Sequence, residues 1–314
     1  MPSLTALLQP SVKRLQQFAL VGLSVLAAAS GAYASSWQAG YENALWQTSD
    51  PSKLNCELTH YIPNFGEARF IHRAGETVRM EIQPFRNALR GGSVKLVALA
   101  PQWMPGANTR SLGEYDFQNT DLPIRIATPQ TELILESLRQ GLMPSMLQED
   151  KDQRIEHRRA SLTPVNFHRA FADFQLCQAQ LLPVNYDQIR DVVIGFNLGG
   201  AKLTQADKDQ LDLLVRYTYA DPEVVLVMVD GHSDSSGTRR DNRELSSQRA
   251  NSVTEYLVAR GMPQEMIKSQ YHGQRYPVAS NRTTEGRSKN RRVTIKFERE
   301  LEIKPIFKLV SLSF

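Results

Sequence analysis

Cysteine, tryptophan and histidine are scarce in this 314-residue sequence, which contains two, three and six of them respectively. The histidines are scattered, so that neither an HExxH motif nor a histidine pair at metal-ligand spacing occurs. The sequence also lacks a GxSxG motif and a phosphate-binding glycine loop. We therefore expect a protein that is not an enzyme, with no catalytic residues, no metal and no cofactor.

A strong excess of charge of one sign is missing as well. The net charge is +4 and the isoelectric point is near 9.0, with the basic residues spread along the chain. This mild excess does not predict nucleic acid as a partner. The hydrophobic content of 41% and charged content of 22% are typical of a globular protein, and the length is sufficient for two domains.

Long apolar runs are limited to residues 18–31, close to the N-terminus. Two basic residues precede this run, and a small-x-small cleavage site follows it. The alternative is a transmembrane anchor, but the run is short for a membrane span and no stop-transfer pattern follows. We predict a signal peptide over residues 1–34, with cleavage between Ala34 and Ser35, and an exported protein without an integral membrane span.

The two cysteines, Cys56 and Cys177, are consistent with export, because an oxidising compartment favours a disulfide between them. Such a bond would close a loop of 121 residues (177 − 56), which stabilises a fold by roughly 4–5 kcal/mol in the unfolded-state entropy model. The alternative is two buried free thiols. A disulfide would make residues 35–183 one closed domain.

The first half of the mature chain has mainly the pattern of β-strands. Val78, Met80 and Ile82 alternate with polar residues, as in a half-buried strand, and turn sequences separate several such segments. Two helices interrupt them: one is capped by Thr128, with Pro129 in its first turn, and the other has Phe167, Phe171 and Phe174 on one face. For residues 35–183 we predict an antiparallel barrel or sandwich with two helices, and a candidate edge strand over residues 153–162.

After a linker around Pro183 the pattern changes to alternating strands and helices. Strands are expected over residues 191–197 and 224–230, the second of them buried on both faces, and a helix capped by Thr204 lies between them. A second helix begins in the acidic stretch at Asp241, and two strands follow it. Residues 184–314 therefore predict an α/β sandwich with a βαβαββ mixed sheet, and the fold class of the whole chain is α+β. Residues 298–314 stay unassigned.

Asp234 and Arg249 are the strongest candidates for a binding site. Asp234 lies in a short polar loop directly after a buried strand, where open α/β sheets bind ligands. Arg249 shares the i, i+4, i+8 series of Leu245, Val253 and Leu257, so that it lies on the inner edge of its helix, where a guanidinium must be paired or used. Spacing alone supports a plain salt bridge and a ligand clamp equally. As a clamp, the pair suits a zwitterion, with arginine for a carboxylate and aspartate for an ammonium group. His232, next to this loop, is more simply a packed residue than an acid–base group.

Three motifs of the second half belong together. They are GHSDSSG at 231–237, NxxLSxxRAxxV at 242–253 and NRTxxGRxxNRRV at 281–293, accompanied by Gly261, Gly273 and Pro277. In these motifs residues 191–297 resemble the OmpA-like peptidoglycan-binding domain, with serine at 233 where that family commonly has threonine.

The resemblance implies roles for individual residues. Asp234 and Arg249 would hold the amine and the carboxylate of diaminopimelate in the peptidoglycan stem peptide. Four further residues would shape or line the same groove: Asn242, Leu245, Arg287 and Asn290. Arg291 and Arg292 belong to the same motif, but a role in supporting the fold explains them equally well.

Two segments of the first half, residues 54–75 and 101–106, together with the region of Cys177, resemble the N-terminal domain of the MotY family of flagellar motor proteins. The order of signal peptide, disulfide-closed β-rich domain and OmpA-like domain covers essentially the whole mature chain. This resemblance implies a periplasmic component of the motor's T ring that joins a MotX-like protein and the basal body and helps to place stator units. The alternative is an OmpA-family protein that tethers the envelope to the cell wall and has no part in motility.

Overall fold

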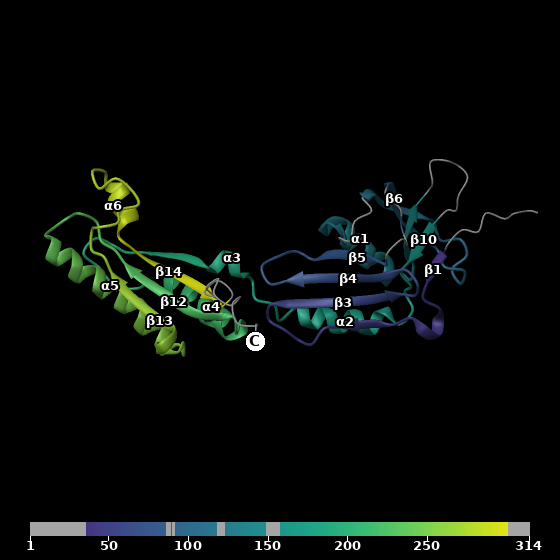
Figure 1. The fold of residues 1–314 in the computed structure, drawn as a ribbon, viewed down its shortest axis with the longest axis horizontal. Coiled ribbons are helices and arrows are strands. Elements are labelled where there is room, and N and C mark those ends of the chain that lie inside the picture. Colours follow the sequence, from purple (N-terminus) through teal and green to yellow (C-terminus); the bar gives the residue numbers. More distant parts are fainter. Residues whose placement is uncertain (1–35, 86–88, 90–91, 118–122, 149–157, 301–314) are drawn as a thin grey trace, which may run out of the picture.

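A computed structural model describes residues 36–85, 89, 92–117, 123–148 and 158–300. The predicted signal peptide, with Ala34 and Ser35, lies outside these residues, as do most of residues 298–314. Two bodies lie along the longest axis and meet near residues 180–186 (Figure 1). Within the described part of the chain, no helix is both long and apolar enough to cross a membrane.

The N-terminal half contains two five-stranded sheets. One has the order β2 (Trp46–Thr48), β3 (Asn55–Ile62), β4 (Gly66–Arg73), β5 (Arg79–Pro84) and β8 (Ile124–Ile126), with antiparallel neighbours throughout. The other has the order β1 (Ser36–Gln38), β10 (Arg158–Ser161), β9 (Met143–Gln148), β6 (Gly92–Leu99) and β7 (Arg110–Phe117). Both sheets contribute to one apolar core, which confirms the predicted β-rich architecture. The prediction of an edge strand is wrong, because β10 lies between two other strands. It pairs with β9 in antiparallel and with β1 in parallel.

Two helices cover this half, as the sequence predicts. In α2 (Phe167–Gln178), Phe167 and Phe174 are fully buried, because their spacing places both rings on the face that meets the sheet. The other helix is α1 (Thr128–Arg139). The prediction that Thr128 caps it is wrong, because Thr128 is its first residue and the N-cap is Ala127. The Thr128 hydroxyl instead donates to the carbonyl of Val78, which ties the helix to the segment before β5. A 3-10 turn, η1, spans Tyr41–Asn43.

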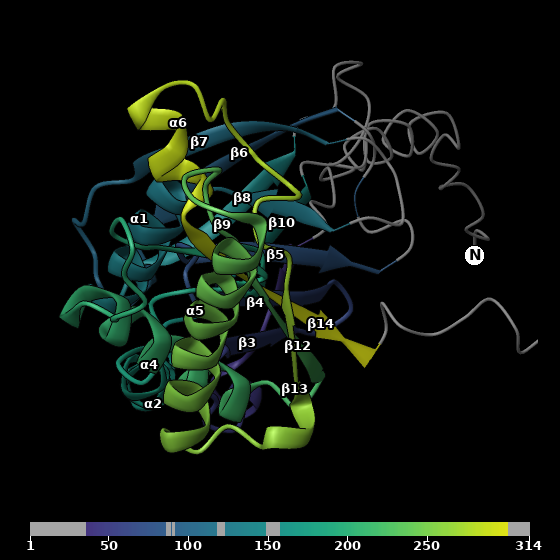
Figure 2. The ribbon, with the colours of Figure 1, turned by 90° about the vertical axis from the view of Figure 1, so that its left-hand side faces the viewer.

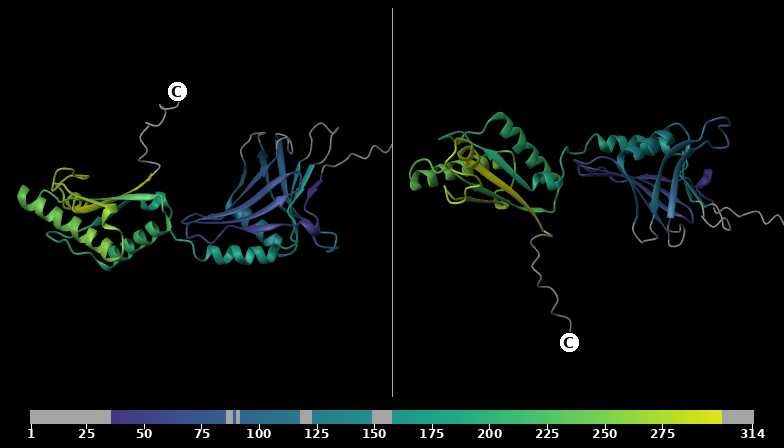
Figure 3. Two further views of the ribbon diagram at one scale, coloured as in Figure 1. Left: turned by 60° about the horizontal axis from the view of Figure 1, so that its bottom comes forward. Right: turned by 90° about the horizontal axis from the view of Figure 1, so that it is seen from above.

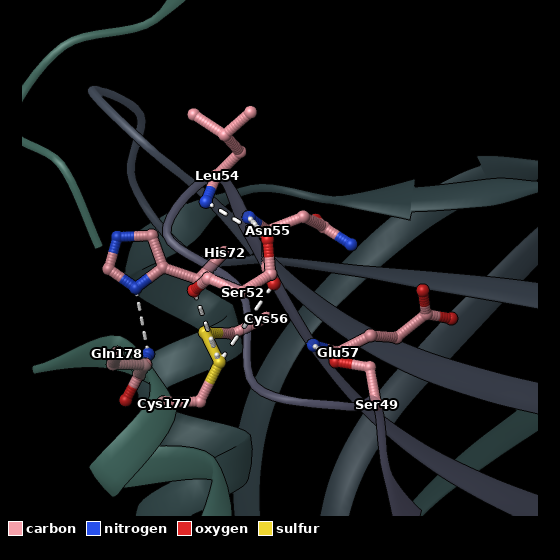
Figure 4. Close-up of a disulfide and its surroundings, with 9 residues drawn as sticks. All are labelled: Ser49, Ser52, Leu54, Asn55, Cys56, Glu57, His72, Cys177 and Gln178. Atoms are coloured by element: carbon pink, nitrogen blue, oxygen red, sulfur yellow. Dashed lines mark hydrogen bonds between the residues drawn. A yellow bond between two sulfur atoms is a disulfide. The ribbon is translucent and has the colours of Figure 1, made fainter. Parts of the chain in front are cut away.

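A disulfide between Cys56 and Cys177 joins β3 to the end of α2 (Figure 4). Both cysteines are buried, at 0% and 5% exposure. Nearby, the side-chain amide of Gln178 lies 2.8 Å from Nδ1 of His72 on β4, so that the same end of α2 is held by a hydrogen bond as well. The predicted pairing is confirmed, and the alternative of two free thiols is excluded.

The C-terminal half alternates helices and strands. In chain order its elements are α3 (Tyr186–Ile189), β11 (Asp191–Gly195), α4 (Gln205–Ala220), β12 (Val224–Gly231), α5 (Arg239–Ala259), η2 (Gln264–Met266), β13 (Ile267–Tyr271), α6 (Thr284–Asn290) and β14 (Arg292–Arg299). The sheet has the order β11-β14-β12-β13, in which β14 is antiparallel to both neighbours and β12 is parallel to β13. The mixed sheet is as predicted, whereas α3, which lies in the predicted linker, and α6 are additional helices.

Helices α4 and α5 pack side by side on one face of this sheet, with α5 across β12, β13 and β14 (Figure 2). Burial along β12 therefore alternates, and Val225 is 38% exposed. The prediction that this strand is buried on both faces is wrong, because helices cover only one of them. The N-cap of α4 is Thr204, as predicted. Helix α5 starts earlier than predicted, with Thr238 as its N-cap.

Candidate functional site

The loops that follow β11, β12 and β13 lie at one edge of the C-terminal sheet, because these three strands run in the same direction. This edge is where open α/β sheets bind ligands. Asp234 stands in the loop after β12, and its side chain is 5% exposed. One carboxylate oxygen accepts from the backbone N–H of Ser236 at 3.0 Å, and the other accepts from Nη1 of Arg291 at 3.1 Å.

Arg249 is delivered to the same edge by α5. It is 0% exposed and is among the largest fully buried side chains of the described residues. Its guanidinium donates to three backbone carbonyls: Nε to Gly200 at 2.8 Å, Nη1 to His232 at 2.9 Å and Nη2 to Asn197 at 3.2 Å. Arg249 thus ties the loop after β11 to the loop after β12. The predicted position on the inner edge of the helix agrees with this burial.

The pairing of charges differs from the simplest expectation. Among the described residues, Asp234 forms its ion pair with Arg291, and no ion pair joins Asp234 to Arg249. Burial lowers the pKa of Arg249 to about 10; the Asp234 carboxylate opposes this shift and the Arg291 guanidinium adds to it. One carboxylate and two guanidinium groups leave an excess of positive charge, which favours an anionic group of a ligand.

The start of α5 is fastened to the neighbouring strand and loop. A Cβ atom on Gly231 would lie 2.1 Å from the carbonyl oxygen of Ser246, so that only glycine allows α5 to approach the end of β12 this closely. The hydroxyl of Ser246 accepts from the N–H of Gly273, and the buried side chain of Asn242 donates to Gln274. Asn242 therefore faces the loop after β13, while Leu245, one turn along α5, is half-buried.

The remaining two predicted residues organise the loop after β13. Asn290 is completely buried; its side-chain oxygen accepts from two backbone N–H groups, and its amide donates to the Ala279 carbonyl and to Asn281. Arg287 donates to the carbonyls of Asn281 and Arg282. The Asn281 side chain in turn accepts from Ser235, next to Asp234. Asn290 and Arg287 thus shape the loop that adjoins Asp234.

His232 is a packed residue, in agreement with the simpler interpretation of the sequence. Its ring stacks on His272 with 5.1 Å between centroids, and His272 lies 3.0 Å from the carboxylate of Asp230. Burial, together with Arg292 and His272, lowers the pKa of His232 to about 4. The ring is therefore neutral near pH 7. In the part of the chain that the structure describes, no group of three or more histidine, cysteine or acidic residues is placed to hold a metal.

Sequence reasoning did not identify Arg291 as the partner of Asp234. Arg291 also donates through Nε to the carbonyl of Phe196 at 3.1 Å, so that it joins the loops after β11 and β12, as Arg249 does. The available signal was its place in the run Asn290-Arg291-Arg292, directly before the central strand β14. Because 57 residues separate it from Asp234 (291 − 234), spacing along one helix or strand does not reveal the contact.

Comparison with known proteins identifies both halves. Residues 37–183 match the MotY N-terminal domain, and residues 195–291 match the OmpA family. The sodium-type flagellar protein MotY of Vibrio parahaemolyticus is 30% identical over 263 residues, which is 82% of this chain and 88% of that protein. The chain belongs to the MotY family. Its C-terminal half is accordingly an OmpA-type domain placed behind a MotY-type N-terminal domain.

Other relatives share only the C-terminal half of this MotY-family chain. The peptidoglycan-binding protein ArfA of Mycobacterium tuberculosis is 42% identical over 102 residues, which is 32% of this chain and 31% of ArfA. Among solved structures, the C-terminal domain of Helicobacter pylori MotB is 24% identical and has a TM-score of 0.33 over 35% of this chain and 85% of that one.

Proposed function

We propose that this MotY-family protein is a non-enzymatic, periplasmic component of the flagellar motor that is anchored in the cell wall. After removal of a signal peptide (residues 1–34), residues 35–183 would join a MotX-like protein and the basal body as part of the T ring. Residues 184–314 would bind peptidoglycan and so help to incorporate and hold stator units. The observation that carries the proposal is the similarity to a flagellar MotY over 82% of the chain, because it includes both halves in the same order.

The ligand that fits the charged edge is a zwitterion, and we assign it to the diaminopimelate of the stem peptide. Its ammonium group would bind Asp234, whose carboxylate retains free acceptor sites, and its carboxylate would bind Arg249. Asn242 and Leu245 would line the groove, while Arg287 and Asn290 fix its outer loop. Because Arg249 is fully buried beneath the carbonyls of Asn197 and Gly200, the ligand carboxylate has to replace these acceptors.

Retention of the purified protein on sacculi tests this site. Asp234→Asn and Arg249→Lys should each lower the affinity roughly tenfold or more. The first removes the charge that pairs with the ammonium group, and the second removes the planar fork of donors that binds a carboxylate. Asp221→Asn is the matched control, since Asp221 is 3% exposed and pairs with Arg299 at the opposite edge of the same sheet. Free diaminopimelate should compete with sacculi for the wild type. If both site variants are folded and are retained like the wild type, the proposed clamp is wrong.

A deletion tests the role in the motor. Cells without the protein should lose swimming, and basal bodies purified from them should lack a ring density. Complementation with Asp234→Asn should restore the ring but not full motility, because only wall binding is removed. Normal swimming together with envelope blebbing would instead support the alternative function, a general tether between the envelope and the wall.

A further inference from the structure

The boundary between the two halves is crossed by apolar side chains. Ala74, in the turn between β4 and β5, and Leu182, in the connection after α2, are 2% and 1% exposed and belong to the core of the C-terminal half. Leu54, directly before β3, packs against the same core. The N-terminal half thus contributes side chains to the other half's interior, whereas domains joined by a plain linker are expected to move relative to one another.

Backbone hydrogen bonds hold the connection from both sides. The N–H of Leu182 donates to the carbonyl of Lys53 at 2.9 Å, and the carbonyl of Leu182 accepts from the N–H of Gly75 at 3.2 Å. A further bond, from the N–H of Ala74 to the carbonyl of Leu54 at 2.9 Å, closes the two N-terminal segments on each other. The backbone of Leu182 is therefore hydrogen-bonded both to the residue pair before β3 and to the β4–β5 turn.

Gly75 fits against the first turn of the C-terminal half. It has φ +66, and a Cβ atom there would lie 2.6 Å from the backbone nitrogen of Asn185 and 2.4 Å from the side-chain oxygen of Gln188. Asn185 and Gln188 form the capping box of α3. That helix is fixed in turn to the sheet, because the hydroxyl of Tyr186 donates to the carbonyl of Phe297 on β14 at 2.9 Å. A side chain at position 75 would push the two halves apart.

The disulfide lies at the same place. Cys56 is two residues after Leu54 (56 − 54), and Cys177 is five residues before Leu182 (182 − 177), so that the bond fastens the start of the connection to β3 (Figure 4). Figure 3 shows α2 leading directly into the connection between the halves. The bond from Gln178 to His72 adds a contact to β4, the strand that ends in the Ala74–Gly75 turn.

We propose that residues 53–56, 72–76 and 177–188 form a rigid interdomain joint that fixes the orientation of the two halves, with Gly75 and the disulfide as its fasteners. A force applied to one half passes through this joint to the other without a flexible linker. The proposal does not depend on what either half binds, so its failure would leave the proposed function intact.

Distances between nitroxide labels test the joint. Labels attached through unnatural amino acids at Glu132 in α1 and Glu255 in α5, both exposed, leave the native disulfide undisturbed. We expect one narrow distance distribution for the wild type and, for Gly75→Ala, a distribution roughly twofold wider or clearly displaced, because the halves then move independently. Gly106→Ala is the matched control: its φ is +95, but an added Cβ meets nothing within 4 Å, so the narrow distribution should persist.

Reduction of the disulfide should also widen the distribution, in a protein whose C-terminal half remains folded. Nuclear spin relaxation of the unsubstituted protein supplies a second measurement that needs no variant: one rotational correlation time is expected for the amides of both halves. Separate correlation times in the wild type, or a distribution for folded Gly75→Ala equal to that of the wild type, would overturn the proposal.

Discussion

The two halves fasten distant segments by different means. In the N-terminal half a covalent bond joins β3 to α2, and among its described acidic and basic side chains only Glu81, at 8% exposure, is buried. The C-terminal half contains no cysteine. Four of its described acidic and basic side chains are buried: Asp221 at one edge of the sheet, and Asp234, Arg249 and Arg292 at the opposite edge. Burial of charge costs free energy, so the three buried charges at one edge favour that edge as the proposed binding site. The N-terminal fastener is thus a covalent bond, whereas Arg249, the fastener of the C-terminal half, lies at the edge for which we propose ligand binding.

Removal of the covalent fastener should have the largest effect. The double variant Cys56→Ser, Cys177→Ser is expected to lose about 4–5 kcal/mol in the free energy of unfolding of the N-terminal half, because the closed loop of 121 residues no longer restricts the unfolded chain. All three tryptophans lie in this half, so that denaturant unfolding followed by tryptophan fluorescence reports on it alone. The wild type under reducing conditions is the control and should behave in the same way. An unchanged midpoint would contradict the assigned role.

Removal of Arg249, the fastener of the C-terminal half, should have the second-largest effect on stability. Arg249→Met leaves the carbonyls of Asn197, Gly200 and His232 without their donor, at an expected cost of about 3–4 kcal/mol to the C-terminal half. Circular dichroism should show an earlier loss of helix, while the tryptophan transition stays in place. Arg240→Met, on an exposed position of the same helix, should change the stability by less than about 0.5 kcal/mol. Equal effects of the two variants would argue against Arg249 as a fastener.

The halves also share a feature, a buried neutral histidine, and this predicts how stability depends on pH. Burial lowers the pKa of His60 from 6.5 to about 4, against a smaller opposing effect of its hydrogen bond to the Leu45 carbonyl. Below pH 6.5 His60 becomes protonated in the unfolded state, whereas in the folded state it stays neutral down to about pH 4. Stability is therefore complete above pH 6.5, falls between these values by about 3 kcal/mol and then levels off.

His60→Phe keeps a ring against Trp46, whose centroid lies 4.3 Å from that of His60, and should remove this component of the pH dependence. The measurement is denaturant unfolding by tryptophan fluorescence between pH 4 and 8. His168→Phe is the control, because the His168 side chain is exposed. If His60→Phe keeps the slope of the wild type, another group is responsible.

Much of the architecture follows from local patterns in the sequence. Alternation at Val78, Met80 and Ile82 predicts a strand, and the structure buries all three residues. Helix α6 has no such signal, because its seven residues, TEGRSKN, carry no apolar face. The continuous apolar run of β12 shows that the strand is apolar but not that both faces are covered. Coverage depends on where helices pack, which is a property of the tertiary fold.

In the candidate site, too, some features follow from local sequence patterns and others depend on the tertiary fold. The burial of Arg249 follows from its place in one helix, at i−4 from the fully buried Val253. The pairing of Asp234 with Arg291 depends on the order of strands in the sheet, because β14 returns between β11 and β12 and places Arg291 beside the loop after β12. Contacts of this kind are non-local. A single sequence contains their residue types but not their geometry.

The smallest effect concerns the start of α5, the helix that carries both Asn242 and Arg249. The sequence predicts a start at Asp241, whereas in the structure the Thr238 hydroxyl accepts from the N–H of Asp241 and caps the helix. Thr238→Ala should therefore destabilise the C-terminal half by about 1 kcal/mol, the usual cost of losing an N-cap. Asp241→Asn keeps the cap and removes only a favourable charge in the first turn, so it should cost a few tenths of a kcal/mol. Thermal unfolding followed by circular dichroism measures both losses of stability. A larger loss for Asp241→Asn than for Thr238→Ala would mean that Asp241, and not Thr238, caps the helix.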